Sequence, residues 1–243
     1  MLASRLDVTD ETTIATAVAG TIERFGAIDV LVNNAGCGLF GPLEGATADQ
    51  FESVFRTNVF GAVAMVRHVL PSMRERRRGT VINVSSIAGR FGSAFLSPYS
   101  ASKYAIEGLS ESLRFELKPH GIRVKVVEPG HFKSDFLSRS TVWTSHPAYE
   151  RQWNNMRAWV DRSTLEAGDP EVVARAVFKS ANDPSDRLRC QVGGSALLTL
   201  RAMLPDAIWR RLLAAGMYRK PRPRRDSGLL PGSAKETESQ DGR

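Results

Sequence analysis

The sequence has little cysteine, no long hydrophobic run and no internal repeat, and each absence excludes a class of protein. Its two cysteines, Cys37 and Cys190, form neither a disulfide framework nor a CxxC or Cys/His cluster with metal-site spacing. Apolar stretches such as residues 59–66 are far shorter than the roughly 20 residues that span a bilayer, and residues 1–10 lack the apolar core of a signal peptide. We therefore expect a cytoplasmic protein with no metal and no transmembrane segment.

The composition is that of a globular domain, and the positive charge is concentrated in two short segments. The chain has 243 residues, of which 42% are hydrophobic and 24% charged, so it can bury a core. A net charge of +7 would suit nucleic-acid binding if a folded face carried it. Residues 219–243 and 74–78 each carry +3, however, which leaves +1 elsewhere. We expect no nucleic-acid partner, and a disordered basic and polar tail over residues 219–243.

Short apolar runs typical of buried strands alternate with helical patterns along the chain. The predicted strands are 29–33, 80–84, 123–127 and a weaker 188–192; the predicted helices are 15–25, 47–73, 97–117 and 170–181. Thr47 is the expected N-cap of the second helix, and Gly79 its stop. This rhythm predicts βαβ units, and therefore an α/β fold whose parallel sheet is covered on both faces.

The rhythm breaks between residues 130 and 168, a segment that carries two phenylalanines and three tryptophans. Open α/β sheets place substrate contacts in such insertions after a strand's carboxyl end, but an aromatic cluster that only packs the domain is an equal alternative. Residues 197–217 form a partly amphipathic helical region interrupted by Pro205, for which we favour core packing over membrane docking.

A GxGxxG string at Gly36, Gly38 and Gly41 follows the first predicted strand and must be weighed as a dinucleotide fingerprint. It fails the test of context, because residues 42–45 separate it from the next helix, whose N-terminus would have to bind the pyrophosphate. We therefore interpret the string as a flexible loop.

Tyr99 and Lys103 form a more informative pair, since four residues on a helix place them one turn apart on the same face. A nearby ammonium favours the ionised form of a phenol, whose ordinary pKa near 10 makes it a poor base at neutral pH. Taken alone, such a YxxxK pair is usually a solvated surface pair. Ser86, at the end of a predicted strand, completes a set that can exchange a proton with a substrate oxygen.

Five motifs in a fixed order raise the significance of that set. They are NNAG at 33–36, TNVFG at 57–61, NVSSIAG at 83–89, YSASK at 99–103 and VVEPG at 126–130. In this order and spacing they resemble the short-chain dehydrogenase/reductase family of the single-domain type, over residues 6–137. The resemblance implies a Rossmann-like, doubly wound domain over residues 1–218 and makes Leu6–Asp10 the family's third strand.

The resemblance also implies an activity: NAD(P)-dependent interconversion of an alcohol and a ketone or aldehyde. Tyr99 would be the general acid and base, Lys103 would lower its pKa and bind the nicotinamide ribose, and Ser86, rather than Ser85, would bind the substrate oxygen. Asn58 would kink its helix and anchor a water. The implied cofactor residues are Asp7, Val8, Asn33, Ala35, Gly36, Tyr99, Lys103, Pro129, Gly130, Phe132 and Ser134. Family members commonly form dimers or tetramers, so we expect a homo-oligomer.

Two features depart from the family pattern. Ser134 stands where a threonine commonly contacts the nicotinamide, although a serine can make the same hydrogen bond. The sequence also begins after the family's first two strands and their TGxxxGxG turn, so the choice between NAD and NADP cannot be read from it. We expect the chain as written to be unstable or rearranged. One hypothesis is an oxidoreductase whose start was set too far downstream, acting on a lipophilic alcohol or ketone; the alternative is a truncated, inactive binding or interaction protein.

Overall fold

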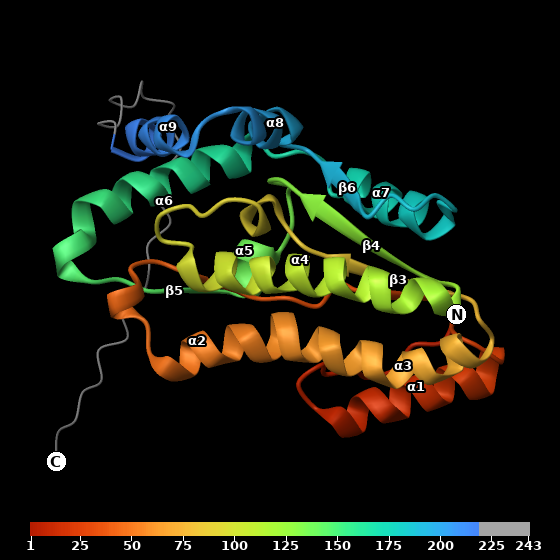
Figure 1. Cartoon of the computed structure of the whole chain (residues 1–243). Coiled ribbons are helices and arrows are strands. Elements are labelled where there is room, and N and C mark those ends of the chain that lie inside the picture. The colour runs from red at the N-terminus through yellow and green to blue at the C-terminus, as the bar shows by residue number, and fades with distance from the viewer. Residues whose placement is uncertain (219–243) are drawn as a thin grey trace, which may run out of the picture.

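Four parallel strands form the main sheet of the computed structural model, which describes residues 1–218 (Figure 1). They lie in the order β1-β3-β4-β6. The strands are β1 (Val30–Asn33), β3 (Gly79–Val84), β4 (Ile122–Pro129) and β6 (Arg189–Val192). All four strands predicted from the sequence are thereby confirmed, and so is the α/β class. The predicted tail over residues 219–243 lies outside the described residues.

Two helices follow the predicted pattern closely, and two differ at their ends. Helices α4 (Ser97–Leu117) and α7 (Glu171–Asn182) agree with prediction, whereas α1 (Glu11–Phe25) begins four residues early, because Asp10 caps it by accepting the Thr12 N–H at 2.9 Å. The helix predicted over 47–73 is α2 (Ala48–Phe55), a π-helical turn at Arg56–Gly61 and α3 (Ala62–Glu75). Gly79 does not stop it, since α3 ends at Glu75 and Gly79 opens β3.

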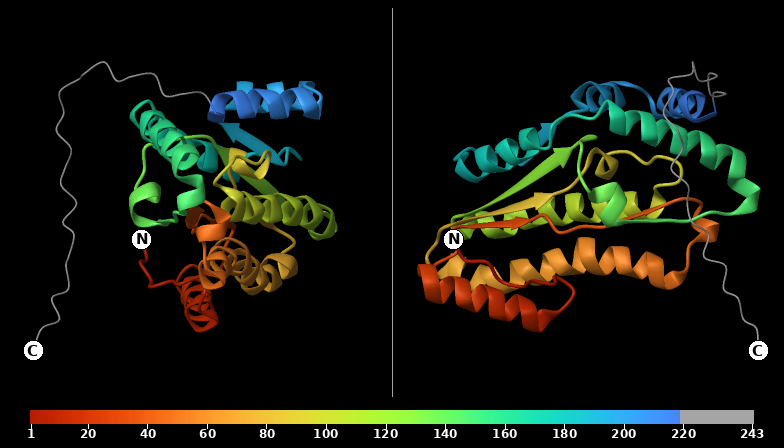
Figure 2. Two further views of the ribbon diagram at one scale, coloured as in Figure 1. Left: turned by 90° about the vertical axis from the view of Figure 1, so that its left-hand side faces the viewer. Right: turned by 180° about the vertical axis from the view of Figure 1, so that it is seen from behind.

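Alternating strand residues bury the two faces of the sheet against different helices. Leu31, Val81 and Val124 pack on one face, against α1, α3 and the end of α4. Ile82, Val127 and Val192 pack on the other, against the apolar side of α7. Figure 2 shows the sheet between α7 on one side and α1, α2 and α3 on the other. This period-two pattern, buried on both faces, is what a parallel sheet requires.

The segment after β4 folds over the carboxyl end of the sheet. It contains α5 (Phe136–Arg139), β5 (Thr141–Trp143) and α6 (Glu150–Leu165), and the chain later closes with α8 (Ser195–Met203) and α9 (Asp206–Tyr218), which lies against α6. Single 3₁₀ turns occur at Leu43–Gly45, Ile87–Gly89, Lys118–His120 and Pro147–Tyr149. Within residues 1–218, no helix is both long and apolar enough to cross a membrane.

The glycine string at residues 36–41 is not the loop that the sequence suggested. Gly38–Phe40 forms strand β2, which pairs in parallel with β5. Gly38 lies so close to Thr141 and Phe136 that an added Cβ would come within 2.8 Å of Thr141 Oγ1. The glycines therefore allow the segment after β1 to pair with the segment after β4.

The family's third strand, expected at Leu6–Asp10, is absent, and this prediction is wrong. No strand partners these residues in the described part of the chain, so their polar groups are satisfied locally. The Asp7 carboxylate accepts the Thr9 N–H at 2.9 Å, and the Asp7 carbonyl accepts the Thr13 hydroxyl at 2.7 Å. The segment is a turn that leads into α1.

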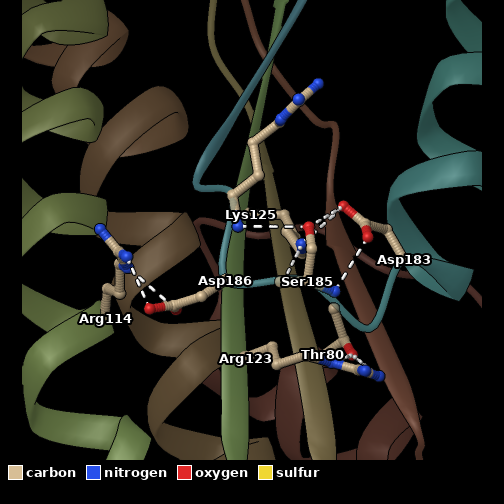
Figure 3. A network of polar contacts seen from close by, with 8 residues as sticks. Thr80, Arg114, Arg123, Lys125, Asp183, Ser185 and Asp186 are labelled. Atoms are coloured by element: carbon tan, nitrogen blue, oxygen red, sulfur yellow. Dashed lines mark hydrogen bonds and ion pairs between the residues drawn. The ribbon is translucent and has the colours of Figure 1, made fainter.

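A polar network ties the loop after α7 to the sheet (Figure 3). Lys125 on β4 is buried, and its Nζ donates to Asp183 Oδ2 at 3.0 Å and to the Ser185 carbonyl at 2.7 Å. The Ser185 N–H, the Lys125 ammonium and the Ser185 hydroxyl hold the pKa of the Asp183 carboxyl well below its usual value. Asp186, on the same loop, pairs with Arg114 of α4 at 2.7 Å and with Lys118, in the 3₁₀ turn that follows α4, at 3.0 Å. The network thus fixes the position of β6 beside β4.

Replacing Asp183 by Asn should destabilise the fold, because it leaves the buried Lys125 ammonium without its counter-charge. A carboxyl with a lowered folded-state pKa stabilises fully above its unfolded pKa of about 3.9 and loses that contribution as the pH falls below it. The difference in the free energy of unfolding between wild type and Asp183→Asn, measured with urea, should therefore be largest near neutral pH and should shrink below about pH 4. Asp186→Asn is the control. It should lower the free energy of unfolding less, because salt screens its exposed ion pairs. A gap that stayed constant with pH would contradict the assignment.

Candidate active site

The residues singled out by the five motifs gather at the carboxyl ends of β1, β3 and β4, beside the first two turns of α4. Parallel sheets place their ligand sites at this edge. The sequence builds α4 there because Pro98, in its first turn, favours helix initiation, and Tyr99 and Lys103 follow on its inner side. The site is therefore made by helix α4 and the loops that leave the strands.

Tyr99 is half-buried under aromatic side chains from β2 and from the segment after β4. Its ring packs edge-on against Phe40 of β2 and tilted against Phe136 of α5, each with centroids 5.6 Å apart. Sequence reasoning missed Phe40, although its place just after the NNAG motif and the parallel pairing of β2 with β5 bring it onto Tyr99. Trp153 is buried in this aromatic cluster and Phe136 contacts Tyr99, so the packing role is observed, and the role in substrate contact stays a prediction.

Ser86, not Ser85, faces Tyr99. Ser86 caps the 3₁₀ turn at Ile87–Gly89 by accepting the Ala88 N–H at 3.1 Å, and it lies close enough to Tyr99 to lower the pKa of the phenol against the effect of burial. Ser85 lies on the other side, next to Glu107. The family resemblance singled out Ser86 by its spacing from Tyr99, and its role in binding the substrate oxygen stays a prediction.

Lys103 is buried, and its Nζ donates to the Val84 carbonyl at 2.9 Å. The Nζ lies 5.8 Å from the centroid of the Tyr99 ring. Burial lowers the pKa of Lys103 to about 8, while Cys37 and Glu107 act in the opposite direction. An ammonium carries three N–H bonds, so two remain for a ligand after the bond to Val84.

The Tyr99 pKa is set mainly by burial in this structure, and the lowering expected from Lys103 stays a prediction. Burial raises the pKa of Tyr99 to about 12, and the hydrogen bond from Ser86 offsets only part of that effect. The reason is that the phenolate would lose its hydration, while Lys103 directs its ammonium at Val84 instead. At neutral pH, Tyr99 is therefore a protonated phenol.

Asn58 occupies the π-helical turn between α2 and α3, where the sequence predicted a distortion of the helix. Figure 1 shows α2 and α3 as one continuous rod through this turn. The Asn58 side chain accepts the Cys37 N–H at 2.8 Å and donates to the Cys37 carbonyl at 2.9 Å and to Ser102 Oγ at 3.0 Å. It thereby joins the loop after β1 to α4.

The residues expected to line the cofactor differ in what their side chains do. Asn33 uses its amide nitrogen internally, donating to Asn83 Oδ1 at 2.8 Å. Ala35 is exposed, and Gly36 lies beside Asn58 and Lys103, where an added Cβ would be 3.3 Å from Asn58 Oδ1 and 3.7 Å from Lys103 Nζ. Asp7 is exposed in its turn, and Val8 packs against Gly61.

The residues after β4 are mostly held by their neighbours. Pro129 ends β4, and the Gly130 N–H donates to the Val192 carbonyl at 2.7 Å. The Phe132 ring covers Gly168 and Gly193, and Ser134 is exposed with its Oγ 3.4 Å from the Phe136 nitrogen. Among the described residues, no group of three or more His, Cys, Asp or Glu side chains is placed to hold a metal ion.

Three named relatives share much of the sequence. An uncharacterized oxidoreductase of Bacillus subtilis, YusZ, is 37% identical over 221 residues, which are 88% of this chain and 79% of that protein. Retinol dehydrogenase 8 of Bos taurus is 35% identical over 232 residues, 90% of this chain and 73% of the relative. The 3-ketodihydrosphingosine reductase of Bacteroides thetaiotaomicron is 44% identical over 137 residues, 56% of this chain and 51% of the relative.

Solved structures share the fold as well. A short-chain dehydrogenase from Streptomyces avermitilis superposes with a TM-score of 0.74 at 37% identity, covering 86% of this chain and 76% of the other. ElxO with NADP bound gives 0.64 at 26% identity, covering 79% and 77% of the two chains. An NAD⁺-bound xylitol dehydrogenase gives 0.65 at 26% identity, covering 76% and 75%.

The family described as short chain dehydrogenase matches residues 1–144, more than half of the chain. The matched span includes the sheet edge, the Ser86 turn and the whole of α4. Together with the relatives, it establishes an oxidoreductase lineage with the Rossmann-like fold seen here. The chain therefore belongs to the short-chain dehydrogenase family.

Proposed function

We propose that this protein is an NAD(P)-dependent oxidoreductase that interconverts an alcohol with a ketone or aldehyde. The observation that carries the proposal is the clustering of Ser86, Tyr99 and Lys103 at one sheet edge, with Asn58 linking their helix to the loop after β1. A protein without catalysis has no physical need for a buried lysine beside a half-buried phenol, since each is destabilised by the loss of water.

The residues present fit the nicotinamide and ribose end of the cofactor. Lys103 has N–H bonds to donate to ribose hydroxyls, and the missing side chain of Gly36 leaves an open approach beside it. Pro129 and Gly130 would line the nicotinamide, with Ser134 as a hydrogen-bonding group. When bound, the cofactor supplies or accepts a hydride. Relatives with NADP and with NAD⁺ support the general cofactor class and leave the choice between the two open.

The four catalytic residues would divide the proton chemistry between them. With a pKa raised to about 12, Tyr99 holds its proton at neutral pH and suits the donation of that proton to a substrate carbonyl oxygen. Ser86 would donate a hydrogen bond to the same oxygen and orient it. A bound cofactor and the Lys103 ammonium would favour the phenolate when the reaction runs towards the ketone. Asn58 would anchor a water between the solvent and Lys103.

The surroundings of Tyr99 support a lipophilic substrate. Aromatic and aliphatic side chains from β2, α5 and α6 form the cluster against which the phenol packs. Two relatives are named for retinol and for 3-ketodihydrosphingosine. We propose a steroid, retinoid or fatty alcohol or ketone as the substrate class.

One observation favours the alternative of an inactive binding or interaction protein. The GxGxxG string enters strand β2 instead of a helix whose N-terminus could bind a pyrophosphate. The DNA immediately upstream of Met1 discriminates between the two. An in-frame TGxxxGxG would support the enzyme, and a stop codon just before Met1 would support the interaction protein.

We expect the 243-residue chain by itself to show no measurable NADH or NADPH binding, because no helix N-terminus among its motifs is placed for the pyrophosphate. Isothermal titration calorimetry with each nucleotide measures this directly. Tight binding of either would show that the residues described above suffice to hold the cofactor.

In a protein that carries a TGxxxGxG turn ahead of these residues, Tyr99→Phe should reduce kcat by about 10²- to 10⁴-fold, because the proton donor is lost. Cofactor affinity should change little, since the ring and Lys103 remain. Tyr104 directly follows Lys103 on α4 and is exposed, so Tyr104→Phe is the matched control and should retain activity. Turnover by Tyr99→Phe equal to that of the control would refute the proposed function.

Phe40→Ala should lower kcat/KM for a long-chain or polycyclic ketone by about 10-fold and affect a small ketone less, because it removes apolar contact area next to Tyr99. Phe178→Ala, at an exposed position of α7, is the control. Steady-state rates for the two ketones with each variant provide the test. Equal losses on both ketones would mean that Phe40 positions Tyr99 and does not select the substrate.

A further inference from the structure

Helices α8 and α9 each carry two apolar sides, and packing within the domain uses only one of them. Leu198 of α8 and Trp209 of α9 are buried around Phe91, and Leu213 packs at the edge of the same cluster. The core packing that the sequence favours for residues 197–217 is therefore observed. It accounts for the inner side of both helices and leaves the outer side unexplained.

The outer side is apolar and exposed. Leu200 and Met203 of α8 are 43% and 76% exposed, and Ile208 and Leu212 of α9 are 45% and 50% exposed. Spacings of three and four residues make the members of each pair neighbours on the surface of their helix. Apolar residues exposed singly are ordinary on a protein surface, whereas a patch made by two consecutive helices marks a docking surface. These four residues are called the α8–α9 patch below.

The two helices that carry the α8–α9 patch form the outermost layer of the fold on their side. Figures 1 and 2 show α8 and α9 at the opposite side of the molecule from α1, α2 and α3. Helix α9 packs against α6, whose Trp153 and Met156 belong to the aromatic cluster beside Tyr99. A surface bound at the patch would therefore lie close to the segment under which Tyr99 packs.

Positive charge adjoins the patch. Helix α9 carries Arg210 and Arg211 at exposed positions, and residues 219–225, which follow α9 in the sequence, contain five basic residues and no acidic one. Asp206, which pairs with Arg210, is the only acidic residue in the sequence between 195 and 225. Clusters of about four to eight basic residues on or beside an amphipathic helix are typical of sites that bind anionic lipid headgroups.

This charge decides between two surfaces that could cover the patch. A second copy of the chain, joined patch to patch, would bring two basic segments together, and like charges oppose such a contact. A lipid surface with anionic headgroups attracts the same charge, while its acyl boundary accepts the apolar side chains. Amphipathic helices of this kind lie in the plane of the interface.

We propose that the α8–α9 patch docks on a membrane surface that contains anionic lipid. Its four apolar side chains insert at the acyl boundary, and the basic residues of α9 and of the sequence after it attract the headgroups. The inference goes beyond the proposed function and does not depend on it, because the patch lies outside the candidate active site. For a lipophilic substrate, docking would bring the segment over Tyr99 close to the lipid phase.

The test is co-sedimentation of the 243-residue protein with phosphatidylcholine vesicles, with and without about 30% phosphatidylglycerol. The protein should bind the anionic vesicles, and binding should be at least about 10-fold weaker without the anionic lipid. Ile208→Gln/Leu212→Gln removes apolar area and no charge, so it should weaken binding to the anionic vesicles by about 10-fold. Met203→Gln should weaken binding less, and it tests α8 independently of α9.

Val172→Gln/Phe178→Gln is the matched control, because it removes two exposed apolar side chains from a different helix, α7. Its binding should equal that of wild type, and circular dichroism checks that each variant is folded. Absence of binding to the anionic vesicles would overturn the inference. Equal binding by Ile208→Gln/Leu212→Gln and wild type would also overturn it, since charge alone would then bind the lipid.

Sedimentation velocity without vesicles tests the competing occupant. A dimer that Ile208→Gln/Leu212→Gln dissociates would overturn the inference, because a second copy of the chain would then cover the patch. None of these measurements needs turnover, so their failure is distinct from the loss of activity expected for Tyr99→Phe, which tests the proposed function.

Discussion

The site depends on the burial of a polar helix face. Along its inner side, α4 places Ser102, Lys103, Glu107 and Ser110 against the sheet, where an apolar helix would present aliphatic residues. Each buried polar group needs a partner, because leaving one unsatisfied costs about 1–3 kcal/mol. Ser102 binds Asn58, Lys103 binds the Val84 carbonyl, and Ser110 binds Asn83, which in turn accepts from Asn33. The partners come from β1, β3 and the π-helical turn, so these hydrogen bonds fix the positions of those elements relative to α4.

This requirement explains why several motif residues that we propose for the active site also hold the fold together. Asn33 and Asn83 connect two strands to α4, and Asn58 connects the π-helical turn to the loop after β1. Glycines provide the close contacts, with Gly36 beside Asn58 and Gly89 against Lys103 and Glu107. The same burial shifts the two titrating groups, with the Tyr99 pKa raised to about 12 and the Lys103 pKa lowered to about 8. Tyr99 is therefore prepared to donate a proton, and the charge of Lys103 depends on its neighbours.

Local patterns predicted much of this arrangement. The four strands followed from apolar runs, Thr47 acted as the expected cap with Gln50 completing a capping box, and Ser86 was selected over Ser85 by its distance from Tyr99. Other features could not be predicted locally. Leu6–Val8 has a strand-like composition but finds no neighbouring strand in the described residues, and Gly38–Phe40 becomes a strand only because Thr141–Trp143 lies beside it.

The sequence by itself determined the α/β class, the order of the elements and the family, because hydrophobic period and motif spacing are properties of the chain alone. The tertiary structure decided the protonation of the site and the set of groups around it. Desolvation of the phenol dominates the Tyr99 pKa, while the Lys103 ammonium donates to the Val84 carbonyl. Phe40 reaches Tyr99 from a distant segment of the chain. Burial and long-range contact are set by packing, and no local pattern of residues encodes them.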